Sequence, residues 1–216
     1  MRLFNRLGQT VLLLMIVAGV SWMLGCAATQ PAERSSTSTG AQISASSVNA
    51  QDARQYRSVK IGDKIWMSEN VNVKTGNSWC YNEDESNCSK YGRLYDWNTA
   101  KTVCPTGWHL PSRQEWDDLV TAVGGSDEAE NALKSTDGWG GFGGSAGTDD
   151  YKFSALPGGR RYNVMHQFLN AGESGYWWMA DDEGQSENAY SFGLGAFGGV
   201  NFDEKENGYS VRCVQN

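Results

Sequence analysis

Two cysteine-bearing segments, more than a hundred residues apart, constrain the fold of this chain most. The first, CPTGWHLPSRQEW, begins at Cys104, and the second, GYSVRCV, contains Cys213. The first reads as the junction between two helices, because a proline ends one helix and Ser112 with Glu115 forms a capping box for the next. The second reads as the last strand of the domain. A bond between Cys104 and Cys213 would tie the middle of the domain to its end.

The N-terminus has the pattern of an export signal. Two arginines precede an apolar stretch, residues 11–24, which is shorter than the roughly 20 residues of a spanning helix. The stretch ends in MLGC, which resembles the bacterial lipobox. That resemblance implies a lipoprotein signal peptide, residues 1–25, and an acylated Cys26 that carries palmitate as a membrane anchor. Ala27 resembles the outer-membrane sorting pattern, so we expect a bacterial cell-envelope lipoprotein attached to the lipid bilayer of the outer membrane.

A tether and a single domain follow the anchor. Residues 26–56 are rich in Ser, Thr, Ala and Gln and predict a flexible coil that spans roughly 30 Å. Residues 57–216 have the length of one domain. The chain holds 26 Gly and 9 Trp, which favours short strands and many loops over a helical bundle. Its formal charge of −7 argues against a nucleic-acid partner.

The five cysteines divide between lipid and disulfides. With Cys26 acylated, an even number remains in an exported chain, which predicts two disulfides. Four cysteines allow three pairings, of which we favour Cys80–Cys88 and Cys104–Cys213. The first closes a small polar loop and the second a loop of over a hundred residues. A metal or redox site is disfavoured because the chain has no CxxC motif and only 2 His.

The remaining pattern predicts an α+β domain with two main helices on a twisted antiparallel sheet. We expect a hairpin over residues 59–73, helices over 94–103 and from Ser112 to Gly124, and a short helix from Ser126 to Leu133. The aromatic runs YKFSAL, YWWMA, AYSFGL and YSVRCV predict strands between long irregular loops. The N-terminal and C-terminal strands are expected to pair.

The chain resembles a known family over almost all of residues 61–214. The matching pieces are IWMSENVN, CYNEDESNCSKYGRLYDWNTA, CPTGWHLPSRQEWDDLV, ALKSTDGW, GTDDYKFSALPGGRR, GYWWMADDE and GYSVRCV. They resemble, in order, the Fibrobacter succinogenes major paralogous domain, which has a C-type lectin-like fold. The resemblance implies a secreted or lipid-anchored bacterial surface protein without a settled activity. Where the family commonly has a WWSSTE-like sequence, this chain has WWMADDE at residues 177–183.

We expect this chain not to be an enzyme. The C-type lectin-like fold also houses oxygenases related to the formylglycine-generating enzyme, which use a cysteine pair with copper or three histidines with iron. With only His109 and His166, and the domain cysteines assigned to disulfides, neither ligand set can be assembled. The chain also lacks GxSxG, HExxH and P-loop motifs. His109 reads as a structural histidine.

Candidate ligand-binding residues lie in the C-terminal half. They are Phe142, Trp177, Trp178, Asp181, Asp182, Glu183 and Phe197. Flat aromatic side chains stack on sugar rings, although in a strand at least one of Trp177 and Trp178 would be buried. An acidic cluster could hold Ca²⁺, which prefers oxygen ligands. Its members are Asp181, Asp182, Glu183, Glu187 and Asn188. We otherwise expect no cofactor.

These observations favour a binding module. Two segments, residues 138–147 and 181–207, are expected to present loops to a polysaccharide or an envelope protein. The alternative is a structural envelope component without a soluble ligand.

Overall fold

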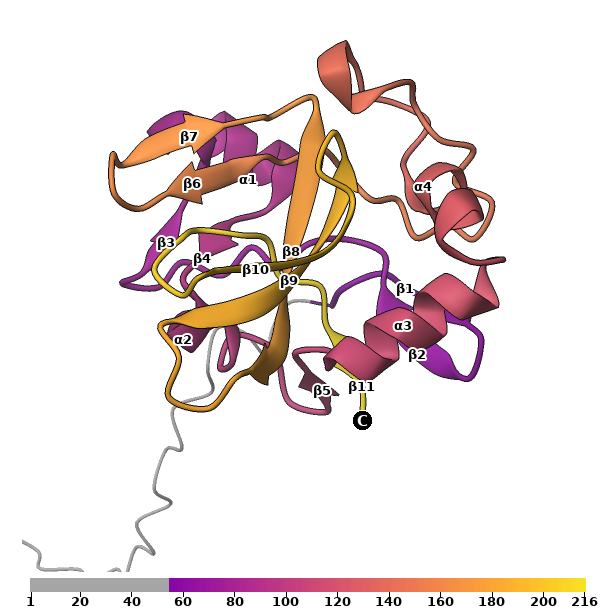
Figure 1. Ribbon diagram of the computed structural model, residues 1–216, viewed down its shortest axis with the longest axis horizontal. Coiled ribbons are helices and arrows are strands. Elements are labelled where there is room, and N and C mark those ends of the chain that lie inside the picture. Colours follow the sequence, from indigo (N-terminus) through magenta and orange to yellow (C-terminus); the bar gives the residue numbers. More distant parts are fainter. Residues whose placement is uncertain (1–54) are drawn as a thin grey trace, which may run out of the picture. The chain divides into compact units, whose positions relative to one another are not determined.

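Strand pairing joins distant parts of this chain. The computed structural model describes residues 55–216 (Figure 1). The predicted signal peptide, the lipidated Cys26 and the tether up to residue 54 lie outside the described residues. Within the described part, no helix has the length and apolar character needed to cross a membrane.

A four-stranded sheet confirms that the two ends of the domain pair. Its order is β1-β2-β11-β5. The bounds are Ser58–Ile61 for β1, Lys64–Met67 for β2, Val214–Gln215 for β11 and Trp108–His109 for β5. The first two strands form the predicted hairpin, and Gly62 takes a φ of 58° in its turn. Val214 pairs with Trp66, which joins the C-terminal strand to the N-terminal hairpin.

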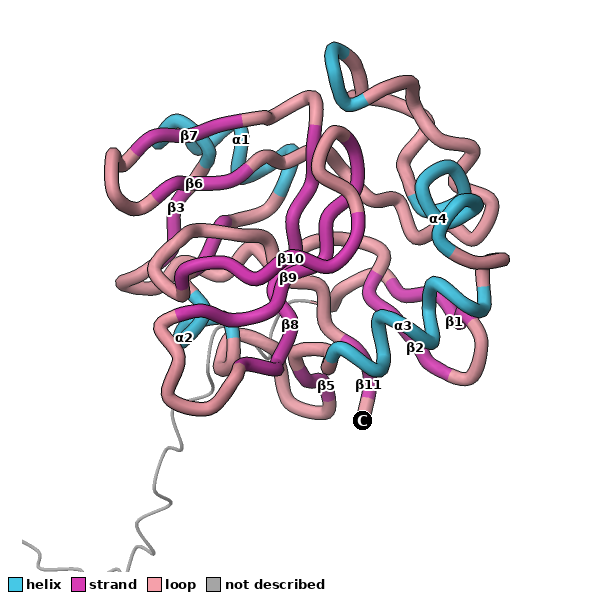
Figure 2. The backbone as a smooth tube through the Cα atoms, viewed as in Figure 1, coloured by secondary structure: helices cyan, strands magenta, loops and turns pink. Residues whose placement is uncertain are grey.

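A three-stranded antiparallel sheet forms the C-terminal half, in the order β10-β9-β8. Its strands are β8 (Ser174–Asp182), β9 (Asn188–Gly195) and β10 (Gly199–Glu204). Two short ribbons complete the strands: β3 (Ser78–Trp79) with β4 (Leu94–Tyr95), and β6 (Arg160–Tyr162) with β7 (Gln167–Leu169). Loops occupy much of the remaining backbone (Figure 2).

The helices follow local capping signals. α3 (Arg113–Ala122) begins at the predicted capping box, in which the Ser112 hydroxyl accepts a hydrogen bond from the Glu115 N–H and the Glu115 carboxylate accepts one from the Ser112 N–H. α4 (Ser126–Leu133) has the predicted bounds, although its N-cap is Gly125 and not Ser126. The other helical segments are η1 (Tyr81–Glu83), α1 (Glu85–Tyr91), α2 (Trp97–Ala100) and η2 (Gly141–Gly143).

Three local predictions were wrong. The helix expected over residues 94–103 shrinks to α2, because Leu94 and Tyr95 pair with β3 and Asp96 caps the helix at the Thr99 N–H, 2.8 Å away. The polar loop between the first two disulfide cysteines instead contains η1 and the start of α1, which is capped by Asp84. Residues 151–156 form no strand, since Lys152 and Ser154 have positive φ angles.

The segment 181–207 was expected to present loops, but it is mostly strand. β9 and β10 occupy most of it, with turns before and between them. These strands extend the sheet that begins with β8, so the segment presents a strand edge and a tight turn.

Strand β8 separates two hydrophobic core clusters. Trp177 belongs to the cluster built on Trp66 and Trp116, and Trp178 to the cluster built on Tyr95 and Tyr209. Successive side chains of a strand point to opposite faces, so neighbouring tryptophans serve different clusters. The result is a mixed α+β domain with antiparallel sheets and few helices.

Both predicted disulfides are confirmed. Cys80 bonds Cys88, and Cys104 bonds Cys213. The second bond fixes the segment before β11, where the Cys213 carbonyl accepts a hydrogen bond of 3.0 Å from the Met67 N–H. The middle of the chain is therefore tied to the end of the domain.

Candidate functional site

A groove of about 440 Å³ lies between helices α3 and α4 and the β9–β10 hairpin. Its helical wall includes Val120 and Ala129, and its strand wall includes Phe192, Leu194 and Val200. Glycines near the hairpin turn line the rest of the strand wall. These side chains make the groove mainly apolar.

The groove forms because the sheet extends beyond the helix that covers it. Trp116 of α3 stacks on Phe192 of β9, with ring centroids 4.5 Å apart and an interplanar angle of 20°. On the next strand, Val200 is paired with Phe192 and Phe202 with Tyr190, so all four side chains share one face. Val200 is 41% exposed and Phe202 38% exposed. Helix α3 therefore leaves this face of β10 largely uncovered.

Two candidate phenylalanines are strongly exposed. Phe197 occupies the β9–β10 turn and is 54% exposed, and Phe142 of η2 is 92% exposed. The turn is tight, because a Cβ atom at Gly193 would clash with the Phe197 carbonyl oxygen. Both phenylalanines lie in the two segments that the sequence nominated, and the structure places them in solvent.

The charged residues that line the groove are both acidic. Asp117 comes from α3 and Glu130 from α4. Glu130 forms an ion pair with Lys134 and accepts a hydrogen bond of 3.1 Å from the Gly195 N–H. This bond fixes α4 against the end of β9. The groove thus combines an apolar floor with a negative rim.

The two candidate tryptophans are not available as a carbohydrate platform. Both indoles are completely buried, so the prediction that they contact ligand was wrong. The Trp177 Nε1 donates to Asn70, 2.9 Å away, and the Trp178 Nε1 donates to the Tyr95 carbonyl, 2.7 Å away. Both faces of β8 are covered, which the alternation rule alone could not show.

The acidic candidates bond to separate partners within the chain. Asp181 accepts from the Arg113 N–H at 2.6 Å, and Glu183 accepts from the Tyr190 hydroxyl at 2.6 Å. The Asp182 carboxylate pairs with Lys205 at 2.6 Å. That hydrogen bond lowers the pKa of Asp182.

The remaining members of the acidic stretch engage through their backbones. The Glu187 carbonyl accepts from Lys205, and the Asn188 N–H donates to Ser186. These separate contacts do not favour the calcium site, which stays a prediction.

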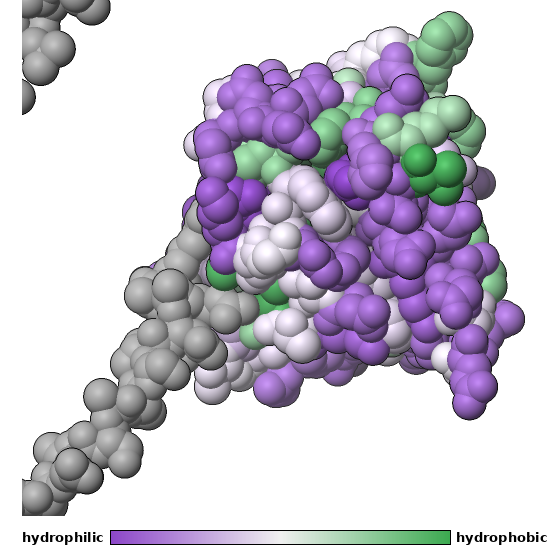
Figure 3. All heavy atoms as spheres, turned by 90° about the vertical axis from the view of Figure 1, so that its left-hand side faces the viewer, coloured by the Kyte–Doolittle hydropathy of each residue, from purple (hydrophilic) through white to green (hydrophobic). Residues whose placement is uncertain are grey.

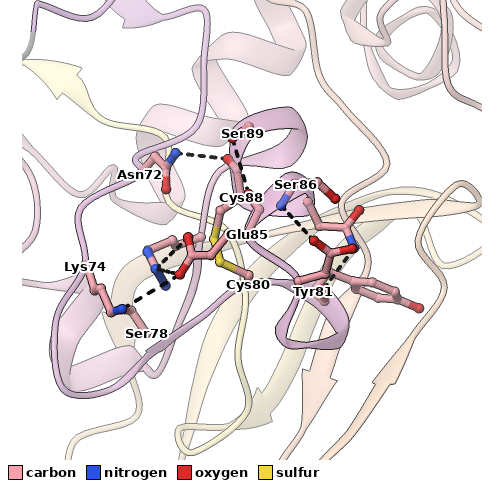
Figure 4. Close-up of a disulfide and its surroundings, with 12 residues drawn as sticks. Asn72, Lys74, Ser78, Cys80, Tyr81, Glu85, Ser86, Cys88 and Ser89 are labelled. Carbon is pink, nitrogen blue, oxygen red and sulfur yellow. Dashed lines mark hydrogen bonds and ion pairs between the residues drawn. A yellow bond between two sulfur atoms is a disulfide. The ribbon is translucent and has the colours of Figure 1, made fainter.

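One group of three potential metal ligands does come together within residues 55–216. It comprises Cys80, Glu85 and Cys88, whose ligand atoms all lie within 4.8 Å of one another. Figure 4 shows that the two sulfur atoms are bonded to each other. A disulfide offers no thiolate, and Glu85 forms ion pairs with Arg93 at 3.0 Å and Lys74 at 3.8 Å. This group is structural.

The histidines are engaged with neighbouring side chains. The His109 Nε2 lies 3.0 Å from Glu115 and its Nδ1 lies 2.7 Å from Asn216. His166 contacts Arg161. Burial would raise the pKa of Glu115, but hydrogen bonds from the Ser112 backbone and from Lys64 and His109 outweigh it and lower the pKa to about 2.

The sequence reasoning missed the groove itself. Strand β10, GVNFDE, alternates apolar and polar residues, and that pattern could have identified Val200 and Phe202 as one face of a strand. It could not show that α3 stops short of this face.

The comparisons with known proteins identify a family and no closer relative. No curated protein matches this chain, and no solved structure matches it. The model of the Fibrobacter succinogenes major domain matches residues 59–215, which is most of the chain. The chain belongs to the Fibrobacter succinogenes major domain family.

Proposed function

We propose that this chain is a lipid-anchored cell-envelope module that binds a protein partner in the groove between α3, α4 and the β9–β10 hairpin. One observation carries the proposal: an apolar groove of about 440 Å³ lies beside the exposed side chains of Phe197, Val200 and Phe202. Exposed apolar patches on a soluble domain mark interaction sites, because a monomer gains nothing from leaving them in water.

The surface chemistry favours a protein over a polysaccharide. Among residues 55–216 no tryptophan is exposed, and the exposed aromatic side chains are those of Phe142, Tyr151, Phe197 and Phe202. Valine, leucine and phenylalanine side chains in the groove instead suit the apolar core of a protein interface. The groove is large enough for one or two partner side chains.

Other exposed apolar residues supply a useful contrast. Val164 and Met165 are 65% and 64% exposed in the turn between β6 and β7, and neither residue lines the groove. Figure 3 shows the side of the molecule that faces left in Figure 1, and hydrophilic side chains dominate it. Exposed apolar residues alone therefore do not indicate a binding site. The groove is favoured because exposed apolar residues lie beside a cavity.

The location rests on sequence features. The lipobox-like MLGC and the Ser-rich tether support an anchored domain that stands off an outer membrane. The α+β arrangement with its two disulfides supports a C-type lectin-like fold.

The test uses the full-length chain in its native envelope. Surface crosslinking followed by purification should recover one protein partner. Phe197→Ala should reduce recovery at least tenfold, since truncation of an anchor residue at the centre of an interface costs about 2 kcal/mol or more. Val164→Ala, at an equally exposed site away from the groove, is the matched control and should recover the partner as the parent does.

Three other outcomes would overturn the proposal. Saturable binding to envelope polysaccharide that survives protease treatment would indicate a lectin. Crosslinks to many neighbours, unaffected by Phe197→Ala, would indicate a structural envelope component. Retention of the partner by Phe197→Ala would place its binding site elsewhere.

A further inference from the structure

Strand β10 has an open hydrogen-bonding edge. In the sheet order β10-β9-β8, β10 pairs with β9 alone. The opposite edge of the sheet is covered, because β8 forms bridges from Gly175 to Gly159 and from Trp177 to Ser210. Only the β10 edge therefore offers backbone donors and acceptors in the register of this sheet.

The open edge lies beside the groove. Val200 of β10 lines the groove, and Phe202 lies two residues further along the same face. The Phe202 ring packs against the Tyr190 ring, with centroids 4.8 Å apart. A strand added beside β10 would lie about 4.8 Å away, with every second side chain on this face. Those side chains would point past β10 toward the exposed flank of α3.

The charges around the β10 edge indicate which kind of segment could pair with it. Asp117 and Glu130 line the groove, and Asp203 and Glu204 lie on β10 itself. The nearby cations Lys205 and Lys134 are paired with Asp182 and Glu130, and the Arg113 guanidinium lies over the Tyr190 ring, 4.9 Å from its centroid. A segment with lysine or arginine would complement this surface, whereas a second copy of β10 would bring the same acidic side chains and be repelled.

Resting on the proposed function, we propose that the protein partner supplies an extended segment of alternating apolar and basic residues, which adds to the edge of β10 as a fourth strand. Main-chain hydrogen bonds to β10 provide the attachment, and the apolar side chains on one face enter the groove. The basic side chains point to the opposite face of the sheet, beside Asp203. With six residues in β10, the added strand spans roughly six residues of the partner.

Hydrogen exchange of the full-length chain in non-ionic detergent tests this mode of binding. The probe is a synthetic peptide of alternating lysine and valine, and the control is a peptide of identical composition with the valines and lysines in separate blocks. The alternating peptide should slow exchange of the β10 amides and bind at least tenfold more tightly than the block peptide. Val200→Lys should weaken it at least tenfold, and Val164→Lys, away from the edge, should leave it unchanged.

The outcomes separate this inference from the proposed function. Equal binding of the two peptides, or protection outside β9 and β10, would overturn strand addition. If strand addition fails while Phe197→Ala still abolishes partner recovery, the groove binds its partner in another way. If both fail, the groove is not a binding site. Crosslinks that join position 202 of two copies of this chain would overturn the proposal and indicate self-association through β10.

Discussion

The two outer strands of one sheet, β8 and β10, have opposite surroundings. The first six residues of β8 are buried, and its tryptophans reach into the two separate core clusters. β10 has exposed residues at four of its six positions. The two sequences differ as well, because β8 carries the continuous apolar run YWWMA and β10 alternates apolar and polar residues.

The difference lies in what covers each strand. The C-terminal segment lies along β8, where the Trp178 N–H donates to the Ser210 carbonyl at 3.1 Å. Tyr209 from the same segment packs its ring on Trp178, with centroids 4.4 Å apart. β10 has no such cover. Aromatic side chains on β8 therefore stabilise the fold, whereas Phe202, the aromatic residue of β10, is partly exposed.

The largest expected loss in the free energy of unfolding comes from releasing the C-terminal segment that covers β8. The double variant Cys104→Ala/Cys213→Ala removes the disulfide that holds the C-terminal segment, and a loop of about this length contributes roughly 4.7 kcal/mol to the free energy of unfolding in the chain-entropy model. Denaturant unfolding measures the loss. Cys80→Ala/Cys88→Ala opens a loop with a separation of only 8 residues and should cost less. Equal losses would contradict the ranking.

Next in size is a matched pair of truncations, one on each strand. Trp178→Ala should lower the free energy of unfolding by about 3–5 kcal/mol, because it empties a fully buried site. Phe202→Ala removes a 38% exposed ring and should cost less than about 1 kcal/mol. Thermal or chemical unfolding of the two variants gives the comparison directly. A large loss for Phe202→Ala would show that β10 also belongs to the core.

Some of this contrast could be predicted from the sequence. The capping box at Ser112 and Glu115 depends on residues three apart, so it was predicted correctly. The disulfide pairing was also correct. The burial of both Trp177 and Trp178 depends on a segment some thirty residues further along the chain, which no local pattern reveals.

The same limit explains the other differences. Leu94 fits helical spacing with Trp97, but pairing with Trp79 of β3 places it in a strand. The groove exists because α3 covers β9 and not β10, which is a matter of packing between distant segments. Phe142 and Phe197 were predicted as candidates because they are aromatic residues in segments expected to be loops. Val200 and Phe202 could be recognised as one face of a strand only from the β9–β10 register.

A smaller effect is expected from the first turn of α3, the helix that packs against β9. In the folded state the pKa of Glu115 is lowered to about 2, against an ordinary value of 4.5. A lowered folded pKa contributes stability above pH 4.5 that is lost as the pH falls toward 2. The melting temperature should therefore drop over this range, and Glu115→Gln should flatten the drop. Asp118→Gln, on the exposed side of α3, is the control. An unchanged slope in Glu115→Gln would show that other carboxylates dominate acid unfolding.

The smallest expected effect concerns the cover of β8 itself. Tyr209 is completely buried between Tyr176 and Trp178, and within the described part of the chain its hydroxyl has no hydrogen bond of normal geometry. Burial raises the pKa of Tyr209, which keeps the hydroxyl neutral. Because a buried hydroxyl without a partner opposes folding, Tyr209→Phe should leave the free energy of unfolding within about 0.5 kcal/mol of the parent or increase it.

The same substitution at Tyr95 should have the opposite result. The Tyr95 hydroxyl donates to the Val73 carbonyl at 2.9 Å and accepts from the Val73 N–H at 2.8 Å. Tyr95→Phe loses both bonds and leaves buried backbone groups without them, so it should cost about 1–3 kcal/mol. If Tyr209→Phe is as costly as Tyr95→Phe, the Tyr209 hydroxyl has a partner, and Arg160 and Asp203 are the side chains close enough to supply it. In that event the C-terminal segment covers β8 through polar contacts as well as packing, and the contrast with the open β10 edge is sharper still.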